Sequence, residues 1–216
     1  MKEIILIDKP KGKTSFKVVA AVRKKYGIKK VGHAGTLDPR ASGLLVIGVG
    51  DTGTKKLTQL IKLPKTYEAT VRVGVQTTTG DLDGDVIRRL PPKGVDVAKV
   101  EKALASMVGS IHLPVPKYSA VKQGGEALYR RVRRGEKVDP PIREMVIRSV
   151  RYVGMKVCPE YIDIDAVFDV GSGTYIRALA EELGKRLGQY PATLAELRRT
   201  KIGDFKIEDV QPLESL

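Results

Sequence analysis

The sequence predicts an α+β protein with a mixed, mostly antiparallel central sheet flanked by helices. Apolar residues alternate with polar ones over 67–75 and over 162–170, which is typical of strands with one buried face. Over 97–107 and 176–187 they recur instead at the spacing of a helix. Strands buried on one face favour antiparallel pairing, because parallel sheets covered on both faces carry continuous apolar runs.

The N-terminal segment predicts a strand followed by a helix. Ile4–Ile7 is a short apolar run, and either Thr14 or Ser15 can cap the helix after it with a side-chain oxygen. Gly27 is placed to end that helix. A second apolar run, 44–49, predicts another buried strand.

The size and charge of the chain indicate one basic domain. With 216 residues, 42% of them hydrophobic, the chain can bury a single good core. Because no repeat or flexible linker divides the sequence, we expect one domain over 1–216. Its 39 Lys and Arg against 25 Asp and Glu leave a formal net charge of +14, which attracts a polyanion. Nucleic acid is therefore the first partner to consider.

Residue types that are rare in the chain bear on its compartment. Cys158 is the only cysteine, so no internal disulfide and no cysteine-based metal cluster can form. The first apolar run is broken by Asp8, Lys9 and Pro10, too early for a signal peptide or a membrane span. We expect a cytoplasmic protein, and the absence of asparagine from a highly charged chain indicates a thermophilic source.

Three familiar motifs are incomplete in this sequence. The glycines of 48–53 spell the GxGxxG of a dinucleotide-binding fold, but no acidic residue ends the following strand and repeated βαβ spacing is lacking. The acidic run 81–85 is similar to a calcium loop in which the glycine and the last ligand are misplaced. His33 and His112 have no set of ligand partners. We therefore expect no cofactor and no metal.

The most informative stretch is 32–45, with the sequence GHAGTLDPRASGLL. Its glycines allow the backbone to approach a ligand closely. Pro39 keeps Asp38 out of helical geometry, so a carboxylate projects from a glycine-rich loop beside basic residues. Taken alone, Asp38 is better explained as a residue that caps a turn.

The whole stretch, however, resembles the catalytic motif of the TruB-type tRNA pseudouridine synthases, with Asp38 at the position of their catalytic aspartate. The resemblance continues, in order and over nearly the whole chain, through 65–69 (KTYEA), 118–122 (YSAVK), 173–177 (GTYIR) and 197–200 (LRRT). Several separated matches are stronger evidence than one short pattern. The resemblance implies the pseudouridine synthase fold and the cofactor-independent isomerisation of uridine to pseudouridine in tRNA.

The resemblance also implies roles for residues of the site. Asp38 acts at C1′ of the ribose or promotes departure of the base as a glycal, two mechanisms between which the sequence does not choose. A uridine must be flipped out of its stack to react. Tyr67 corresponds to the tyrosine that stacks on it and helps to move a proton from C5. Arg177 would keep the aspartate ionised and oriented, and Tyr175 would line the pocket.

The remaining implied contacts are to RNA. Leu197 corresponds to the apolar residue that packs on the uracil edge, and His33 to a histidine in the space that the flipped base leaves. A basic segment, 117–143, resembles the insertion that clasps the RNA. Gly124 and Gly125 are candidate hinges for this segment, which we expect to order on tRNA. The residues of it that we expect to contact RNA are Lys122, Arg130 and Arg133.

The substrate and the partners are implied in the same way. The resemblance implies uridine 55 in the T arm of tRNA, and we expect a monomer that requires no protein partner. Because the chain ends at Leu216, we expect no C-terminal module of the PUA type.

Three alternatives stay open. One is a module that only binds or folds tRNA, which Asp38→Asn would separate from an enzyme. Another is a relative of the guide-RNA-dependent rRNA pseudouridine synthases. The third, a nucleotide-dependent enzyme, predicts that the purified protein binds a dinucleotide.

Overall fold

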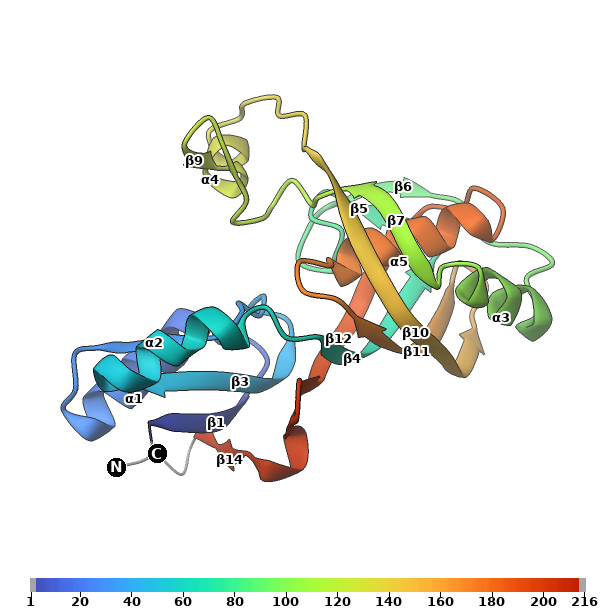
Figure 1. Cartoon of the computed structure of the whole chain (residues 1–216). Coiled ribbons are helices and arrows are strands. Elements are labelled where there is room, and N and C mark those ends of the chain that lie inside the picture. The colour runs from blue at the N-terminus through green and yellow to red at the C-terminus, as the bar shows by residue number, and fades with distance from the viewer. Residues whose placement is uncertain (1–2, 214–216) are drawn as a thin grey trace. The chain divides into compact units, whose positions relative to one another are not determined.

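The computed structural model describes residues 3–213, which form two compact units (Figure 1). The first unit comprises Met1–Glu68, Asp169–Ser172 and Glu196–Leu216, and the second comprises Ala69–Phe168 and Gly173–Ala195. Strands β4 (Lys65–Val73) and β12 (Ala192–Ile202) each run from one unit into the other.

The first unit is a mixed sheet with its helices packed on it. Its elements are β1 (Ile4–Lys9), α1 (Ser15–Tyr26), β2 (Val31–His33), β3 (Ser42–Val49), α2 (Gly50–Leu60), β13 (Phe205–Lys206), the 3₁₀ helix η1 (Ile207–Asp209) and β14 (Gln211–Pro212). The strands follow the order β14-β1-β3-β12. β3 runs antiparallel to β1 and β2, whereas β12 runs parallel to β3 and β14 parallel to β1.

The alternation of side chains in β1 divides them between two small cores. Ile5 and Ile7 are buried in a cluster with the valines of α1. Ile4 and Leu6 pack on the other cluster, together with the leucines of α2. β3 is buried on both faces, which explains its continuous apolar run. One face of this sheet is therefore covered by α1 and the other by α2.

Both predicted ends of α1 are confirmed. Thr14 is the N-cap, since its Oγ1 accepts a hydrogen bond from the Lys17 amide at 3.1 Å. Gly27 ends the helix with a φ of +65°, a conformation that glycine adopts without a steric penalty.

The glycines of 48–53 bring α2 close to the sheet. A Cβ atom at Gly53 would lie 2.2 Å from the Glu3 carbonyl oxygen, and one at Gly48 would lie 2.4 Å from the Gly53 carbonyl oxygen. The GxGxxG pattern is therefore accounted for by the contact between the helix and the strands.

The second unit contains most of the remaining elements. They are β5 (Val75–Thr77), β6 (Val86–Arg89), α3 (Val97–Ala105), β7 (Gly109–Pro114), β8 (Lys122–Gln123), β9 (Glu126–Ala127), α4 (Leu128–Arg133), β10 (Ile142–Val157), β11 (Ile162–Val170) and α5 (Ile176–Arg186). Its main strands follow the order β4-β11-β10-β7, and β10 and β7 are antiparallel. α3 contacts β10 and α5.

The polar residues of β4 and β11 pair with one another. Arg72 donates two hydrogen bonds to the Asp163 carboxylate, one from Nε and one from Nη2, each at 2.8 Å. Thr70 donates to Asp165 at 2.6 Å. The Arg72 guanidinium also lies 3.8 Å from the centre of the Tyr161 ring. Asp163 and Asp165 of β11 thus serve cross-strand pairing.

The elements expected from periodicity are confirmed. The strands over 67–75 and 162–170 are β4 and β11, and the helices over 97–107 and 176–187 are α3 and α5, each with boundaries within two residues of the expected ones. The expected mixed sheet with flanking helices is likewise confirmed. No helix within residues 3–213 is both long and apolar enough to span a bilayer.

Candidate active site

Asp38 lies in the loop between β2 and β3, and buried side chains hold the residues around it. Ser15, the first residue of α1, makes two bonds to Leu37. Its Oγ accepts a hydrogen bond from the Leu37 amide at 2.9 Å and donates one to the Leu37 carbonyl at 3.1 Å. Ser15 is 2% exposed, so these bonds are shielded from water. Position 37 is thereby fixed to α1.

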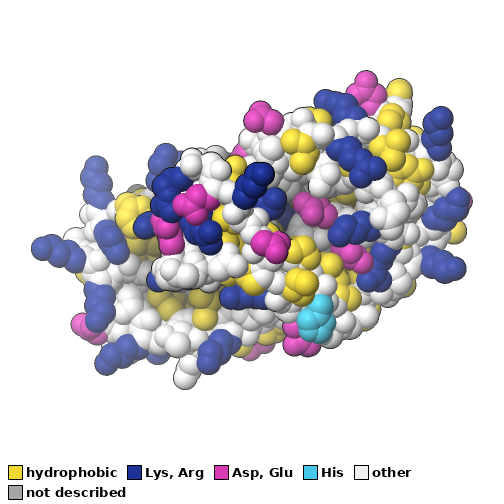
Figure 2. Space-filling model, turned by 90° about the horizontal axis from the view of Figure 1, so that it is seen from above, with side chains coloured by type: hydrophobic (Ala, Val, Ile, Leu, Met, Phe, Trp, Pro, Cys, Tyr) yellow, Lys and Arg dark blue, Asp and Glu magenta, His cyan; other side chains and the backbone are white. Residues whose placement is uncertain are grey.

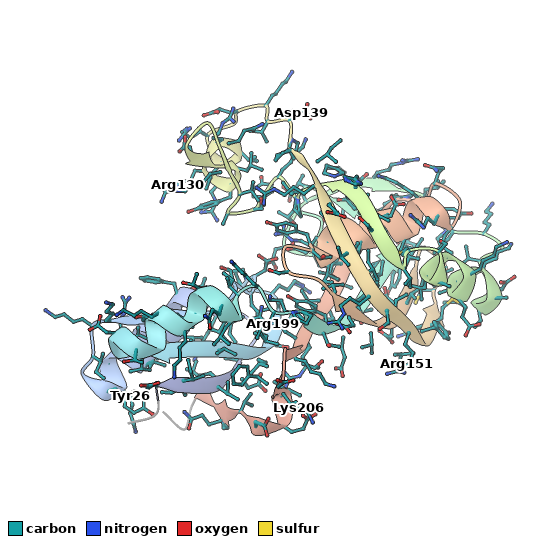
Figure 3. The ribbon with its side chains drawn as sticks, viewed as in Figure 1. Tyr26, Arg130, Asp139, Arg151, Arg199 and Lys206 are labelled. Atoms are coloured by element: carbon teal, nitrogen blue, oxygen red, sulfur yellow. The ribbon has the colours of Figure 1, made fainter. Side chains whose placement is uncertain are left out.

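Arg199 holds the same loop at two other points. Its side chain comes from β12, beside β3 (Figure 3), and is 1% exposed. Nη2 donates to the Gly35 carbonyl at 3.0 Å, and Nε donates to the Leu44 carbonyl at 2.8 Å. A single planar guanidinium therefore fixes the backbone on both sides of Asp38.

This close approach of β12 to β3 depends on Gly43. In the parallel register Gly43 lies opposite Arg199. A Cβ atom at position 43 would fall 2.3 Å from the Arg199 carbonyl oxygen, and the φ of Gly43 is +103°. Only glycine satisfies both conditions.

Lys9 holds the C-terminal side of Asp38. Its Nζ donates to the carbonyls of Pro10 at 3.0 Å, Lys13 at 2.6 Å and Pro39 at 3.3 Å. Arg199, Ser15 and Lys9 thus bind positions 35, 37 and 39, every second residue of the loop. Asp38 between them is half-buried.

The charge around the loop is positive. Burial lowers the pKa of Lys9 to about 8, the Asp38 carboxylate opposes that shift, and the Arg199 charge adds to it. Burial and Arg199 likewise lower the pKa of Lys65 to about 8. The Lys65 ammonium is held by the carbonyls of Ile61 at 2.8 Å and Leu63 at 2.5 Å. Each buried cation thus has carbonyl partners, as burial of charge requires.

Three other expected site residues also belong to the first unit. Tyr67 is 8% exposed on β4, and Leu197 is half-buried on β12. His33 ends β2, and burial together with the Arg199 charge lowers its pKa. Both effects favour the neutral form of the His33 imidazole.

Arg177 and Tyr175 belong to the second unit, at the start of α5. Arg177 is 7% exposed. Its Nη1 donates to the Thr79 carbonyl and its Nη2 to the Tyr118 carbonyl, both at 2.9 Å. Tyr175, the N-cap of α5, is half-buried. The guanidinium of Arg177 is therefore held in a fixed position and is not an ordinary surface group.

The acidic run 81–85 has a structural role. Asp81 is 8% exposed, and its carboxylate accepts hydrogen bonds from Thr79 Oγ1 at 2.5 Å and from the Asp83 amide at 3.1 Å. This aspartate orders the turn whose Thr79 carbonyl binds Arg177. Within residues 3–213, no three His, Cys, Asp or Glu side chains come together to hold a metal.

The expected RNA-clasping segment is a small folded insertion, residues 115–141, between β7 and β10. Gly124 and Gly125, with φ of +64° and +85°, form the two-residue turn between β8 and β9, as hairpins of this kind require. The expectation that they are hinges of the insertion is therefore wrong. The expected segment also ran to 143, and its last two residues belong to β10.

Ion pairs stabilise this insertion from within. The Arg134 guanidinium donates to both carboxylate oxygens of Glu126 at 2.6 Å, and also to Glu136 at 2.6 Å. Arg131 donates to Glu136 at 2.8 Å. These two arginines bind the insertion itself. Its other basic residues are exposed and have no such ion pair among the described contacts: Lys117, Lys122, Arg130, Arg133 and Lys137.

The exposed arginines surround an aromatic ring. The guanidinium carbons of Arg130 and Arg133 lie 5.9 Å and 5.7 Å from the centre of the Tyr129 ring, and Arg130 Nε donates to the Tyr129 hydroxyl at 3.2 Å. Figure 3 shows Arg130 on the α4 side of the insertion. A ring flanked by two guanidinium groups can bind both a base and a phosphate.

The chain shares its fold with solved chains of larger assemblies. It matches a chain in the crystal structure of a Cbf5-Nop10-Gar1 complex with a TM-score of 0.73 and 29% identity, over 99% of this chain and 53% of that one. A chain in a structure of an H/ACA RNP bound to a substrate RNA containing 2′-deoxyuridine matches with a TM-score of 0.70 and 27% identity, over 99% and 51%. The chain thus spans about half the length of these solved chains.

Sequence comparison gives the family. Residues 23–176 match the TruB family pseudouridylate synthase (N terminal domain). The chain therefore belongs to the TruB family of pseudouridylate synthases, and it is an enzyme of the isomerase class, as the motifs implied.

Curated relatives match the chain almost from end to end. "tRNA pseudouridine synthase B" of Thermobifida fusca is 42% identical over 217 residues, which cover 99% of this chain and 73% of the relative. The protein of the same name from Corynebacterium glutamicum (strain R) is 40% identical over 213 residues, covering 99% and 71%.

Proposed function

We propose that this protein converts uridine 55 in the T arm of tRNA to pseudouridine without a cofactor, with Asp38 as the catalytic carboxylate. The curated relatives named tRNA pseudouridine synthase B support tRNA as the substrate. The observation that carries the role of Asp38 is the fixation of the loop around it at Gly35, Leu37 and Pro39 by three buried side chains.

The reaction needs little beyond positioned groups. The C1′–N1 bond breaks, the uracil turns, and a C1′–C5 bond forms. The proton that leaves C5 is balanced by one taken up at N1, so neither a redox partner nor a second substrate is required. A carboxylate at C1′ can carry the first step, either by covalent attack or by assisting departure of the base as a glycal.

A fixed loop suits this chemistry because the reacting carbon must be met at a defined distance and angle. Lys9, which lies close enough for the Asp38 carboxylate to oppose the lowering of its pKa, in turn favours the ionised form of Asp38. The charged form of the Asp38 carboxylate is thus favoured, and its loop is held in place within the first unit.

The other roles follow the motif matches. Tyr67 stacks on the flipped uracil and helps to move the C5 proton, and Leu197 packs on the edge of the ring. Arg177 is a catalytic residue and Tyr175 lines the pocket, while His33 contacts RNA as a neutral group. In the insertion, Lys122, Arg130 and Arg133 contact the tRNA backbone. The enzyme acts as a monomer in the cytoplasm and requires no protein partner.

The test is pseudouridine formation on a defined RNA. Purified protein is incubated with an unmodified tRNA transcript in the absence of added metal or cofactor, and pseudouridine is mapped at single-nucleotide resolution. We expect modification at uridine 55 by the wild-type protein and none by Asp38→Asn, with tRNA affinity retained. Asp51→Asn, which alters an exposed carboxylate paired with Lys30, is the matched control and should remain active.

Other outcomes would change the proposal. Modification at another uridine would keep the chemistry and replace the substrate position. Equal activity of Asp38→Asn would remove the carboxylate from the mechanism. Tight binding without modification by either protein would favour a module that only binds or folds tRNA.

A further inference from the structure

We propose that the exposed face of α1 is a second RNA-contact surface, distinct from the insertion, which binds the sugar-phosphate backbone of the RNA that reaches the catalytic loop. We call it the α1 face; it consists of Lys13, Phe16, Lys17, Ala20 and Lys24, all of them exposed. This proposal rests on the proposed function, because it assumes that the loop acts on an RNA.

The sequence that contains α1 carries positive charge without negative charge. Between Asp8 and Asp38 the sequence contains no acidic residue, whereas basic residues occur throughout. The basic positions in that interval are Lys9, Lys11, Lys13, Lys17, Arg23, Lys24, Lys25, Lys29 and Lys30. Lys and Arg side chains are also widespread on the face of the molecule drawn in Figure 2, with fewer acidic ones among them. Lys9 is buried, and Lys11 and Lys30 pair with carboxylates of other elements, but the remaining positive surface fits a polyanion.

Helical geometry places the α1 face on one side. Its buried residues, Ser15, Val18, Val19 and Val22, point to the core. Phe16, Ala20 and Lys24 follow one another at intervals of four and therefore share the opposite side. From Phe16 to Lys24 the helix rises about 12 Å, the length of roughly three to four nucleotides at about 3.4 Å per step along a double helix.

Phe16 gives this face more than charge. Phe16 is 68% exposed. Because burying an aromatic ring is favourable, a phenylalanine with so little packing against the protein is unusual. The Arg23 guanidinium lies 6.0 Å from the ring centre and donates to the Val31 carbonyl at 3.0 Å. An exposed aromatic ring among lysines is the combination that binds a base or a ribose next to phosphates.

The α1 face adjoins the catalytic loop within the same unit. Ser15, which precedes Phe16, is bonded to Leu37, and the Gly12 amide donates to the Pro39 carbonyl at 2.8 Å. Residues 12–16 are therefore neighbours of 37–39. An RNA strand whose uridine reaches Asp38 therefore lies next to the segment from which the α1 face begins.

Flexible lysines suit contacts to phosphates, which fix the position of an RNA without reading its sequence. Each phosphate contact steepens the fall of log K with log salt by about 0.7 to 0.9. The number of contacts made by the α1 face can therefore be measured directly.

The experiment measures tRNA affinity over a series of salt concentrations for Lys13→Gln/Lys17→Gln/Lys24→Gln and for Phe16→Ala. The same chain carrying Asp38→Asn serves as the background, so binding is measured without turnover. The matched control is Lys55→Gln/Lys62→Gln/Lys201→Gln, which removes the same charge from exposed positions of the same unit. Thermal unfolding of each variant verifies that it is folded.

We expect the α1-face triple variant to bind about 10-fold more weakly and to reduce the salt slope by about 2, as the loss of two to three phosphate contacts predicts. Phe16→Ala should weaken binding about 5-fold with an unchanged slope. An equal loss in the control variant, or an unchanged slope in the α1-face variant, would overturn the proposal. Because binding is measured without catalysis, failure of the wild-type protein to form pseudouridine would be a separate result.

Discussion

The Arg199 guanidinium donates a hydrogen bond to the Gly35 carbonyl at 3.0 Å, across 164 positions of sequence. Its second bond, to Leu44, lies on the other side of Asp38. One buried side chain thus sets the distance between the two ends of the loop around Asp38, and we expect its replacement to alter catalysis more than RNA binding.

For Arg199→Lys we therefore expect kcat to fall by about 100-fold, the cost of a displacement of about 1 Å in a positioned group. The two carbonyls are bound by different nitrogens of the planar guanidinium, whereas a lysine has only one nitrogen and cannot reproduce that spacing. tRNA affinity should stay within about 3-fold of wild type. The control is Arg198→Lys, at the adjacent residue, which pairs with Asp8. A fall in affinity with unchanged kcat would contradict the positioning role.

Ser15 and Thr14 provide a matched pair of alanine variants. Ser15→Ala leaves the Leu37 amide and carbonyl without their buried partner, and Thr14→Ala removes the cap of α1. Each should lower the free energy of unfolding by about 1 to 2 kcal/mol. Only Ser15→Ala should lower kcat, by about 10-fold. Urea unfolding and single-turnover kinetics measure the two effects, and an equal loss of kcat in both variants would attribute it to stability alone.

Gly43→Ala should destabilise the protein by about 3 kcal/mol or more. The added Cβ would lie 2.3 Å from the Arg199 carbonyl oxygen at a φ of +103°. Gly12→Ala separates the backbone strain from the steric clash, because position 12 has a φ of +87° and no atom within 4 Å of an added Cβ. It should cost only the backbone strain, about 1 to 2 kcal/mol. Similar melting temperatures for the two variants would show that the contact with β12 is unimportant.

The buried Lys65 predicts a dependence of stability on pH. Its pKa is lowered from 10.5 to about 8 on folding, so between these values the unfolded chain binds more protons than the folded one. The free energy of unfolding therefore rises with pH over that window. From pH 7 to pH 10 the stability of wild type relative to Lys65→Met should increase by roughly 2 kcal/mol. The stability of wild type relative to Lys62→Met, a substitution at an exposed position, should not change over the same pH range.

The insertion predicts different consequences for neighbouring arginines. Arg134→Ala removes the pairs to Glu126 and Glu136 and should expose 115–141 to trypsin in the absence of RNA. Arg133→Ala, at an exposed position beside Tyr129, should leave the cleavage rate of the free protein nearly unchanged and weaken tRNA binding by about 3- to 10-fold. Rapid cleavage of both free variants would mean that the ion pairs do not hold the insertion together.

Local sequence patterns predicted the elements in which apolar residues recur at a regular spacing. β4, β11, α3, α5 and the ends of α1 are examples, because each depends on neighbours in sequence. β10 was not predicted as a strand of 16 residues, since charged residues interrupt its apolar pattern. β12 was missed for another reason: arginines stand in its second half, and one of them is buried.

The candidate active site was predictable only in part. Asp38, Tyr67 and Arg177 stand in recognisable motifs, whereas the supports of the loop do not. Nothing local distinguishes Lys9 or Arg199 from the other 37 basic residues of the chain, because their burial depends on strands that pair across long distances. Gly124 and Gly125 were assigned to hinges for a similar reason, as the same pair of residues also suits a tight hairpin turn.

The dependence of the loop on Arg199 also has a consequence for protein synthesis. Gly35 emerges from the ribosome long before Arg199 does, and the bond between them cannot form until β12 has been made. A nascent chain that ends before β12 carries every atom of the loop around Asp38 but lacks the side chain that spans it. The loop around Asp38 therefore acquires its full set of supports only after β12 has been synthesised and can pair with β3.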